Sequence, residues 1–135
     1  MRKITEIIVH CTATRERLDI GAAEIDRYHR QRGFDSIGYH YVVRLDGSIE
    51  KGRDESAVGA HCLSHNVCSI GVAYVGGLDA DGKPKDTRTP AQKRSLSALL
   101  TELRRRYPGA KIHGHRDFAA KACPCFDATK EYAAL

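Results

Sequence analysis

Histidines and cysteines gather at three places in this 135-residue sequence, and together they could hold a metal ion. The three places are His10-Cys11, His113-Gly114-His115 and Cys123-Pro124-Cys125. One histidine from each of the first two places and one cysteine from the third would supply three ligands. Zinc binds imidazole and thiolate well, and three protein ligands leave its fourth position open for water, as in catalytic sites. The spacing does not choose between His113 and His115, or between Cys123 and Cys125.

A second group of potential ligands lies in the middle of the chain. It consists of His61, Cys62, His65 and Cys68. Four such donors could close a structural zinc site, although their spacing matches neither a zinc finger nor a zinc ribbon. A Cys62–Cys68 disulfide after export is a further alternative. The cysteine count of five is odd, and no secretion signal is recognised, so we expect free thiols rather than a disulfide framework.

Two predicted strands would bring the outer ligand groups together. Residues 4–11 are rich in β-branched residues and predict a buried strand, and residues 110–115 predict a short one. Side chains alternate along a strand, so His113 and His115 should point to the same side. By the same rule Cys11 should point away from His10, into the core. The ligands would then lie at strand ends and in the loop that follows, where sites are commonly built.

The remaining pattern predicts an α/β fold. Helices are expected near residues 19–32, over 89–107 and after Asp127, and strands over 39–44, 48–51 and 69–75. Thr89-Pro90-Ala91-Gln92 carries the capping signals of the second helix, and Asp46-Gly47 is a hairpin turn. The alternation also predicts that Tyr39 and Tyr41 share a face, with His40 opposite them as a structural hydrogen-bonding residue. The sequence therefore predicts one domain over residues 1–135, with a central mixed β-sheet of about five strands and helices packed on it.

Composition excludes several classes of protein. Hydrophobic residues make up 41% and charged residues 29% of the chain, an ordinary balance for a globular domain. No apolar run approaches the length of a membrane span, and Glu6 and His10 interrupt the only apolar run near the N-terminus. We therefore expect a protein that stays in the cytoplasm of the producing cell. The net charge of +5 is compatible with nucleic acid or an anionic cell wall, but selects neither.

Several motifs, in order along nearly the whole chain, carry a resemblance to one family. They are Val9-His10-Cys11-Thr12-Ala13-Thr14, Ile37-Gly38-Tyr39-His40-Tyr41, Gly59-Ala60-His61, Ser69-Ile70-Gly71-Val72, Thr89-Pro90-Ala91-Gln92, His113-Gly114-His115-Arg116-Asp117 and Lys121-Ala122-Cys123-Pro124. The sequence resembles the zinc-dependent N-acetylmuramoyl-L-alanine amidases of the type-2 amidase and peptidoglycan recognition protein superfamily. It is most similar to the short phage lysozyme-like amidases.

The resemblance implies a reaction and a set of site residues. Members of the family hydrolyse the amide between the lactyl group of N-acetylmuramic acid and the L-alanine of the peptidoglycan stem peptide. The implied residues are His10, His115 and Cys123 as ligands of one zinc ion per chain, Tyr39 and Lys121 as catalytic groups, and His61 in the substrate groove. It implies an endolysin of a phage or prophage that reaches the cell wall after release. Peptidoglycan is then the partner, with no nucleic acid, no membrane, and a monomeric protein.

The residues suit amide hydrolysis on chemical grounds as well. A lysine two positions before a ligand, Lys121, could bring positive charge to a developing oxyanion, and the Tyr39 hydroxyl could hydrogen-bond the nucleophile or the tetrahedral intermediate. Asp117 could orient a ligand histidine, because metal-bound histidines usually donate their second N–H to a carboxylate or carbonyl.

Three other functions compete with the amidase reading. One is a peptidoglycan-binding module without activity, although such relatives lack the cysteine that is present here as Cys123. Another is a cysteine hydrolase that uses Cys123 with a histidine. A zinc nucleobase deaminase fits poorly, because its Pro-Cys-x-x-Cys signature would need a cysteine where this chain has Ala128.

Overall fold

A five-stranded mixed sheet forms the centre of the computed structural model, which describes residues 2–135. The strands are β1 (Glu6–Cys11), β3 (Tyr41–Val43), β4 (Ile49–Lys51), β5 (Ser69–Tyr74) and β7 (Lys111–Gly114), in the order β4-β3-β5-β1-β7. Only the β3–β4 hairpin is antiparallel, and β1 lies between two parallel neighbours. A separate ribbon pairs β2 (Thr14–Arg15) with β6 (Gly77–Leu78). The expected mixed sheet of about five strands is confirmed.

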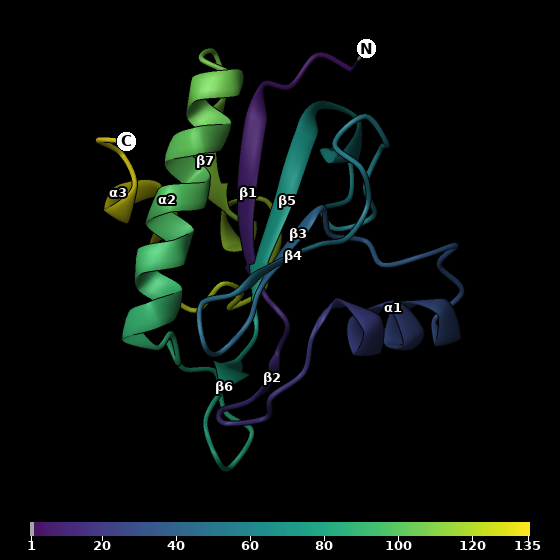
Figure 1. Ribbon diagram of the computed structural model, residues 1–135, viewed down its shortest axis with the longest axis vertical. Helices are drawn as coiled ribbons and strands as arrows, with labels where there is room; N and C mark the ends of the chain where they lie inside the picture. Colours follow the sequence, from purple (N-terminus) through teal and green to yellow (C-terminus); the bar gives the residue numbers. More distant parts are fainter. Residues whose placement is uncertain (1) are drawn as a thin grey trace.

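Helices cover both faces of this sheet. Figure 1 shows α2 (Pro90–Arg106) and α1 (Ala22–Gln31) on opposite sides of the strands. The short α3 (Ala128–Glu131) and two 3₁₀ turns, Asn66–Cys68 and His115–Asp117, complete the fold. No helix within residues 2–135 is long and apolar enough to cross a bilayer.

Helix α2 forms where its capping signals predict. Thr89 accepts a hydrogen bond from the Gln92 amide, while the Gln92 side chain accepts one from the Thr89 amide. The buried Gln92 amide group also donates to the carbonyls of Val43 and Val75, which fastens the start of the helix to the sheet. Buried leucines at helical spacing then pack the helix on β1, β3 and β5; they are Leu96, Leu99, Leu100 and Leu103.

Alternation along the strands decides which side chains face the pocket side. Ile7, Val9 and Cys11 of β1 point into the core under α2, so His10 points to the opposite face. The expected direction of Cys11 is confirmed. The prediction for the tyrosines is wrong: Tyr41 lies in the core under α2, while Tyr39 packs with the cluster on the α1 side. Strand β3 begins only at Tyr41, so the strict alternation does not extend back to Tyr39.

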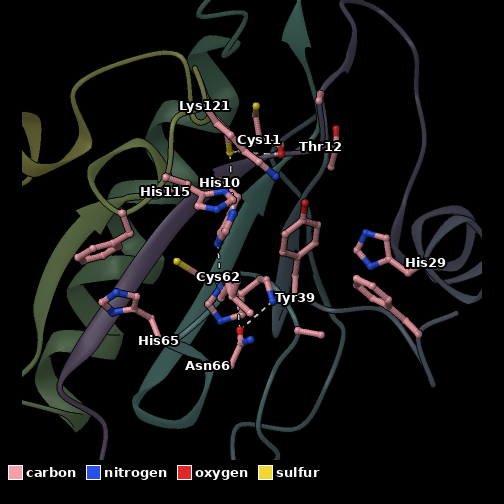
Figure 2. Close-up of a pocket in the computed structure, with 18 of the residues that line it drawn as sticks. His10, Cys11, Thr12, His29, Tyr39, Cys62, His65, Asn66, His115 and Lys121 are labelled. Atoms are coloured by element: carbon pink, nitrogen blue, oxygen red, sulfur yellow. Dashed lines mark hydrogen bonds between the residues drawn. The ribbon is translucent and has the colours of Figure 1, made fainter. Parts of the chain in front are cut away.

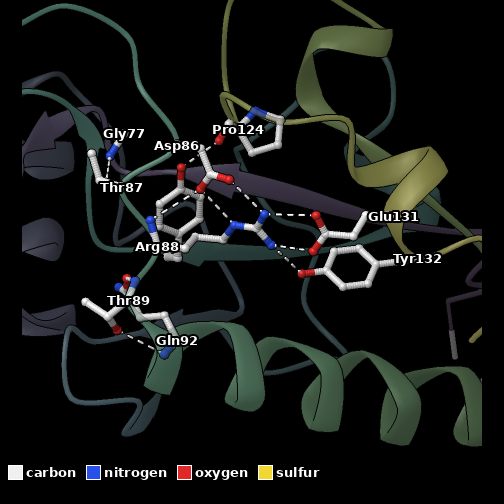
Figure 3. Close-up of polar contacts among 10 residues, drawn as sticks. Gly77, Asp86, Thr87, Arg88, Thr89, Gln92, Pro124, Glu131 and Tyr132 are labelled. Atoms are coloured by element: carbon white, nitrogen blue, oxygen red, sulfur yellow. Dashed lines mark hydrogen bonds and ion pairs between the residues drawn. The ribbon is translucent and has the colours of Figure 1, made fainter.

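A buried arginine ties the loop before α2 to the C-terminal segment. The side chain of Arg88 is 2% exposed and forms ion pairs with Asp86 (2.9 Å) and Glu131 (2.6 Å). Its guanidinium also donates to the Tyr132 hydroxyl and lies 3.4 Å from the centre of the Phe126 ring. Figure 3 shows Asp86, Glu131 and Tyr132 around the Arg88 guanidinium. The sequence does not reveal this cluster, because nothing local distinguishes Arg88 from an arginine that is exposed to solvent.

The same region supports the loop that carries two of the cysteines. The buried Tyr74 hydroxyl donates a 2.6 Å hydrogen bond to the Pro124 carbonyl, so β5 fixes the loop from behind. Phe126 packs in the core below the Arg88 guanidinium. Cys123 therefore stands at the end of a loop that is held by the core on one side and by the Arg88 cluster on the other.

Candidate metal centre and active site

Three side chains from distant parts of the chain bring their ligand atoms together. His10 is the last residue but one of β1, His115 directly follows β7, and Cys123 lies in the next loop. The ligand atoms of these three residues all lie within 4.8 Å of one another. His10 Nδ1 is 3.8 Å from Cys123 Sγ, and the two imidazole ring centres are 4.6 Å apart. Two imidazoles and one thiol at this spacing fit a zinc ion with one open position.

The two cysteines of the loop have different surroundings. The Cys11 amide donates to Cys123 Sγ at 3.2 Å. Hydrogen bonds from the Cys11 side chain and amide, opposed by burial, lower the pKa of Cys123, and the charge of Lys121 acts in the same direction. Burial instead raises the pKa of Cys125 to about 11, and its thiol donates to the Gly77 carbonyl. Cys123 is therefore the cysteine that is prepared to act as a thiolate ligand.

The histidines at the site are electrostatically suited to remain neutral. Burial first, and then the neighbouring histidines and Lys121, lower the pKa of His10 well below its usual value. Burial and the charge of Lys121 lower the pKa of His115 in the same way. A neutral imidazole keeps a lone pair for a metal ion, so these shifts favour ligation over protonation.

A cavity of ≈ 830 Å³ opens in front of these residues. Figure 2 shows Tyr39 and Lys121 directed toward the space beside His10 and His115, while His29 of α1 lies at the far end. The side chains that line the cavity include no aspartate or glutamate, and the permanently charged ones are Arg32 and Lys121. The cavity therefore suits a substrate with negative charge.

Tyr39 and Lys121 both line this cavity, as the resemblance implies. The Tyr39 ring centre is 5.2 Å from that of His10. Burial first, and then the nearby cysteines, raise the pKa of Tyr39, so its hydroxyl keeps its proton at neutral pH. Lys121 is exposed on the loop before Cys123. The two side chains can offer a hydroxyl donor and a positive charge to the same region.

His61 lines the cavity and also directly contacts His10, one of the three candidate ligands. Its Nδ1 lies 2.8 Å from His10 Nε2, and its Nε2 lies 3.2 Å from the Ser69 hydroxyl oxygen. Burial, chiefly, lowers the pKa of His61 to about 3. Sequence reasoning missed the contact with His10, because 51 residues separate the two histidines and no local pattern joins them.

The rest of the central histidine and cysteine group does not converge on one point. His65 pairs with Glu6 at 2.8 Å and stacks on Phe118, with ring centres 3.9 Å apart. Cys68 also turns to Glu6, while Cys62 is buried and free. Within residues 2–135, His10, His115 and Cys123 are the only group of three or more potential ligands that meets the 4.8 Å spacing. The alternative of a closed zinc site over residues 61–68 is therefore wrong.

Asp117 does not orient a ligand histidine. Its carboxylate accepts a hydrogen bond from the Gly114 amide and lies 3.6 Å from Nδ1 of His113. The 3₁₀ turn that starts at His115 brings Asp117 back toward β7, and so places it beside the wrong histidine for that role. The expectation for His40 is confirmed: its Nδ1 accepts from the Gly71 amide, and its Nε2 lies 2.8 Å from the Ala57 carbonyl.

Comparison with known sequences gives consistent results. Residues 1–126 match the model of the N-acetylmuramoyl-L-alanine amidase family. The endolysin of Klebsiella phage KP32 is 46% identical over 126 residues, which span 93% of this chain and 83% of that protein. The endolysin of Escherichia phage T7 is 46% identical over 121 residues, which span 90% of this chain and 80% of that protein.

Solved structures share the same fold. The N-acetylmuramoyl-L-alanine amidase LysC from Clostridium intestinale superposes with a TM-score of 0.81 at 32% identity, over 96% of this chain and 82% of that one. Bumblebee PGRP-SA superposes with a TM-score of 0.80 at 22% identity, over 100% of this chain and 83% of that one. At this lower identity the second match speaks for the fold alone.

Proposed function

The chain belongs to the N-acetylmuramoyl-L-alanine amidase family, and from this membership we propose that it is a zinc-dependent endolysin acting in host-cell lysis. Its substrate is the amide between the lactyl group of N-acetylmuramic acid and L-alanine of the stem peptide. One observation carries the zinc part of the proposal: the ligand atoms of His10, His115 and Cys123 lie within 4.8 Å of one another at the cavity. We take the domain to span residues 1–135 and to act as a monomer.

In this proposal His10, His115 and Cys123 hold one zinc ion per chain. When bound, zinc supplies an activated water nucleophile and polarises the scissile carbonyl. Two neutral imidazoles and one thiolate leave a formal charge of +1 at such a centre, which favours an oxyanion. The thiolate is supported by the hydrogen bonds from Cys11.

Tyr39 and Lys121 act on the reacting amide. The protonated Tyr39 hydroxyl donates a hydrogen bond to the tetrahedral intermediate, and the Lys121 ammonium brings positive charge to the same oxyanion. His61 belongs to the wall of the groove near the metal ligands. The cationic lining, with Arg32 and Lys121 and no carboxylates, suits a stem peptide that carries carboxylate groups.

Digestion of purified sacculi tests the reaction. We expect stem peptides with a free L-alanine amino group and glycan strands that carry free lactyl carboxylates. New reducing sugar ends, or cuts confined to peptide–peptide bonds, would contradict the proposal. Zinc analysis of the purified protein should give about one ion per chain, and chelation should abolish activity that added zinc restores. Activity that resists chelation but is lost on thiol alkylation would instead favour a cysteine hydrolase.

A further inference from the structure

The two ring nitrogens of His10 face different partners. Nδ1 lies 3.8 Å from Cys123 Sγ and is directed toward the other ligand atoms. Nε2 lies 2.8 Å from Nδ1 of His61 on the opposite side of the ring. His10 is 1% exposed, so its Nε2 needs a hydrogen-bond partner within the protein. His61 Nδ1 is that partner.

The hydrogen bonds can run in only one direction if His10 Nδ1 is to bind a cation. A neutral His10 then carries its proton on Nε2 and donates it to His61 Nδ1. His61 in turn carries its proton on Nε2, which lies 3.2 Å from the Ser69 hydroxyl oxygen. Both ring nitrogens of His61 are therefore engaged by the protein, one by a candidate ligand and the other by β5.

Several parts of the fold fix the His61 ring in this position. The backbone amides of His61 and Cys62 both donate to the Asn66 side-chain oxygen at 2.9 Å. The ring lies directly over Gly71 of β5, where a Cβ atom would come within 2.6 Å of it. It meets the His10 ring edge to face, with an interplanar angle of 88°. A side chain that only touched substrate in the groove would not need this support.

We propose that His61 is a positioning residue of the metal centre: its Nδ1 accepts the Nε2 proton of His10, which fixes the His10 tautomer and directs Nδ1 at the metal ion. The inference rests on the proposed zinc site and gives His61 a role there in addition to its place in the groove wall. It also explains why β5 has a glycine at position 71, since the ring occupies the space that a side chain would need.

Zinc affinity tests this role without reference to catalysis. His61→Leu removes the acceptor. The asparagine of His61→Asn has nearly the same shape as that leucine, but its side-chain oxygen keeps an acceptor near the former Nδ1. Competition against a chromophoric chelator should show zinc binding weakened ~10–100-fold in His61→Leu. His61→Asn should recover most of that loss. His65→Ala is the matched control on the same loop, because His65 contacts Glu6 and Phe118 rather than a ligand, and its zinc affinity should equal that of the wild type.

A cobalt-substituted protein gives a second readout. The visible absorption bands of bound Co²⁺ should change in His61→Leu, because the His10 ring is no longer oriented, and should return toward the wild type in His61→Asn. Ser69→Ala removes only the outer acceptor and should weaken zinc binding less than His61→Leu; it also serves as the test variant if His61→Leu does not fold.

The outcomes separate this inference from the proposed function. A wild-type protein that binds no zinc would overturn both. Zinc binding by the wild type with unchanged affinity in His61→Leu and Ser69→Ala would overturn the positioning role alone. An increase in KM for His61→Leu without any change in zinc affinity or in the cobalt spectrum would assign His61 to substrate contact only.

Discussion

The loop over residues 123–126 borders two buried polar clusters that differ in whether their polar groups are paired with protein partners. On one side, Arg88 is surrounded by two carboxylates, a tyrosine hydroxyl and an aromatic ring, so its charge is matched by partners. On the other side, the nitrogen and sulfur atoms of His10, His115 and Cys123 face one another within 4.8 Å. The Arg88 cluster is stabilised by ion pairs and hydrogen bonds within the protein. The second cluster instead directs its nitrogen and sulfur lone pairs toward one position, where a metal ion could bind.

This difference separates what holds the fold from what performs the chemistry. Removing a partner from a matched buried ion pair is destabilising, because it leaves buried charge uncompensated. Removing one member of the group His10, His115 and Cys123 breaks no such ion pair, but it should destroy the capacity to bind a metal ion. Substitutions in the ligand cluster should therefore affect activity, and substitutions around Arg88 should affect stability.

The largest effect is expected at Cys123. Cys123→Ser should lose zinc and lower turnover by ~10³-fold or more, since the metal ion supplies several kcal/mol of transition-state stabilisation. Cys125→Ser should keep zinc and turnover, because Cys125 hydrogen-bonds to Gly77 rather than facing the other ligands. Metal analysis and a sacculus assay measure both quantities. The ligand assignment is wrong if the two variants behave the other way round.

The next largest effects are expected at Tyr39 and Lys121, which we propose to act beside the metal ion. Tyr39→Phe and Lys121→Ala should each lower kcat by ~10²-fold or more while the zinc content stays at that of the wild type, because each removes a contact to the oxyanion. The midpoint of urea unfolding should change little in Lys121→Ala, whose side chain is exposed. If both variants kept a kcat near that of the wild type, neither Tyr39 nor Lys121 would have a catalytic role.

A smaller effect, on stability, is expected on the other side of the loop. Arg88→Met should lower the free energy of unfolding by ~2–3 kcal/mol, because it removes charge-assisted hydrogen bonds to Asp86 and Glu131. The folded variant should keep its zinc content and its kcat, as measured below the unfolding transition. If Arg88→Met lost zinc without losing stability, the separation of the two clusters would not hold.

The smallest expected effect is a pH dependence of stability that arises from the Glu131 carboxylate, which pairs with Arg88. The hydrogen bond from Arg88 lowers the pKa of Glu131, against the opposing effect of burial. A depressed carboxylate pKa contributes stability that is present above its unfolded value of 4.5 and is lost as pH falls through the folded value. Urea unfolding from about pH 5 down to about pH 3 should therefore show a steeper loss in the wild type than in Glu131→Gln. If the free energy of unfolding fell equally steeply with pH in both proteins, the ion pair of Glu131 with Arg88 would not contribute to stability.

Local signals explain why much of the fold could be predicted. The capping residues Thr89 and Gln92 define the start of α2 from within one turn, and Asp46-Gly47 defines the β3–β4 turn. The candidate metal ligands could be narrowed to three places for a similar reason, because each stands near the end of a strand or in the loop after it. Choosing Cys123 over Cys125 required the family resemblance; the contacts of the two thiols are consistent with it.

Contacts between distant segments account for the rest. The partner of His10 is His61, in a loop whose path depends on Asn66 and Gly71, and no spacing rule connects these positions. The residues around Arg88 in the sequence are those of an ordinary polar loop, and its partner Glu131 comes beside it only in the folded chain. The faces of Tyr39 and Tyr41 were assigned wrongly because β3 begins at Tyr41, two residues later than the alternation requires.

The central place of β1 also bears on how the protein is made. During translation β1 leaves the ribosome first, yet its two neighbours, β5 and β7, are synthesised much later. Its apolar side chains stay without their sheet partners through most of synthesis, which exposes the nascent chain to chaperones and to aggregation. His10 is translated early and Cys123 long afterwards, so a growing chain cannot assemble a metal centre until its sheet is complete.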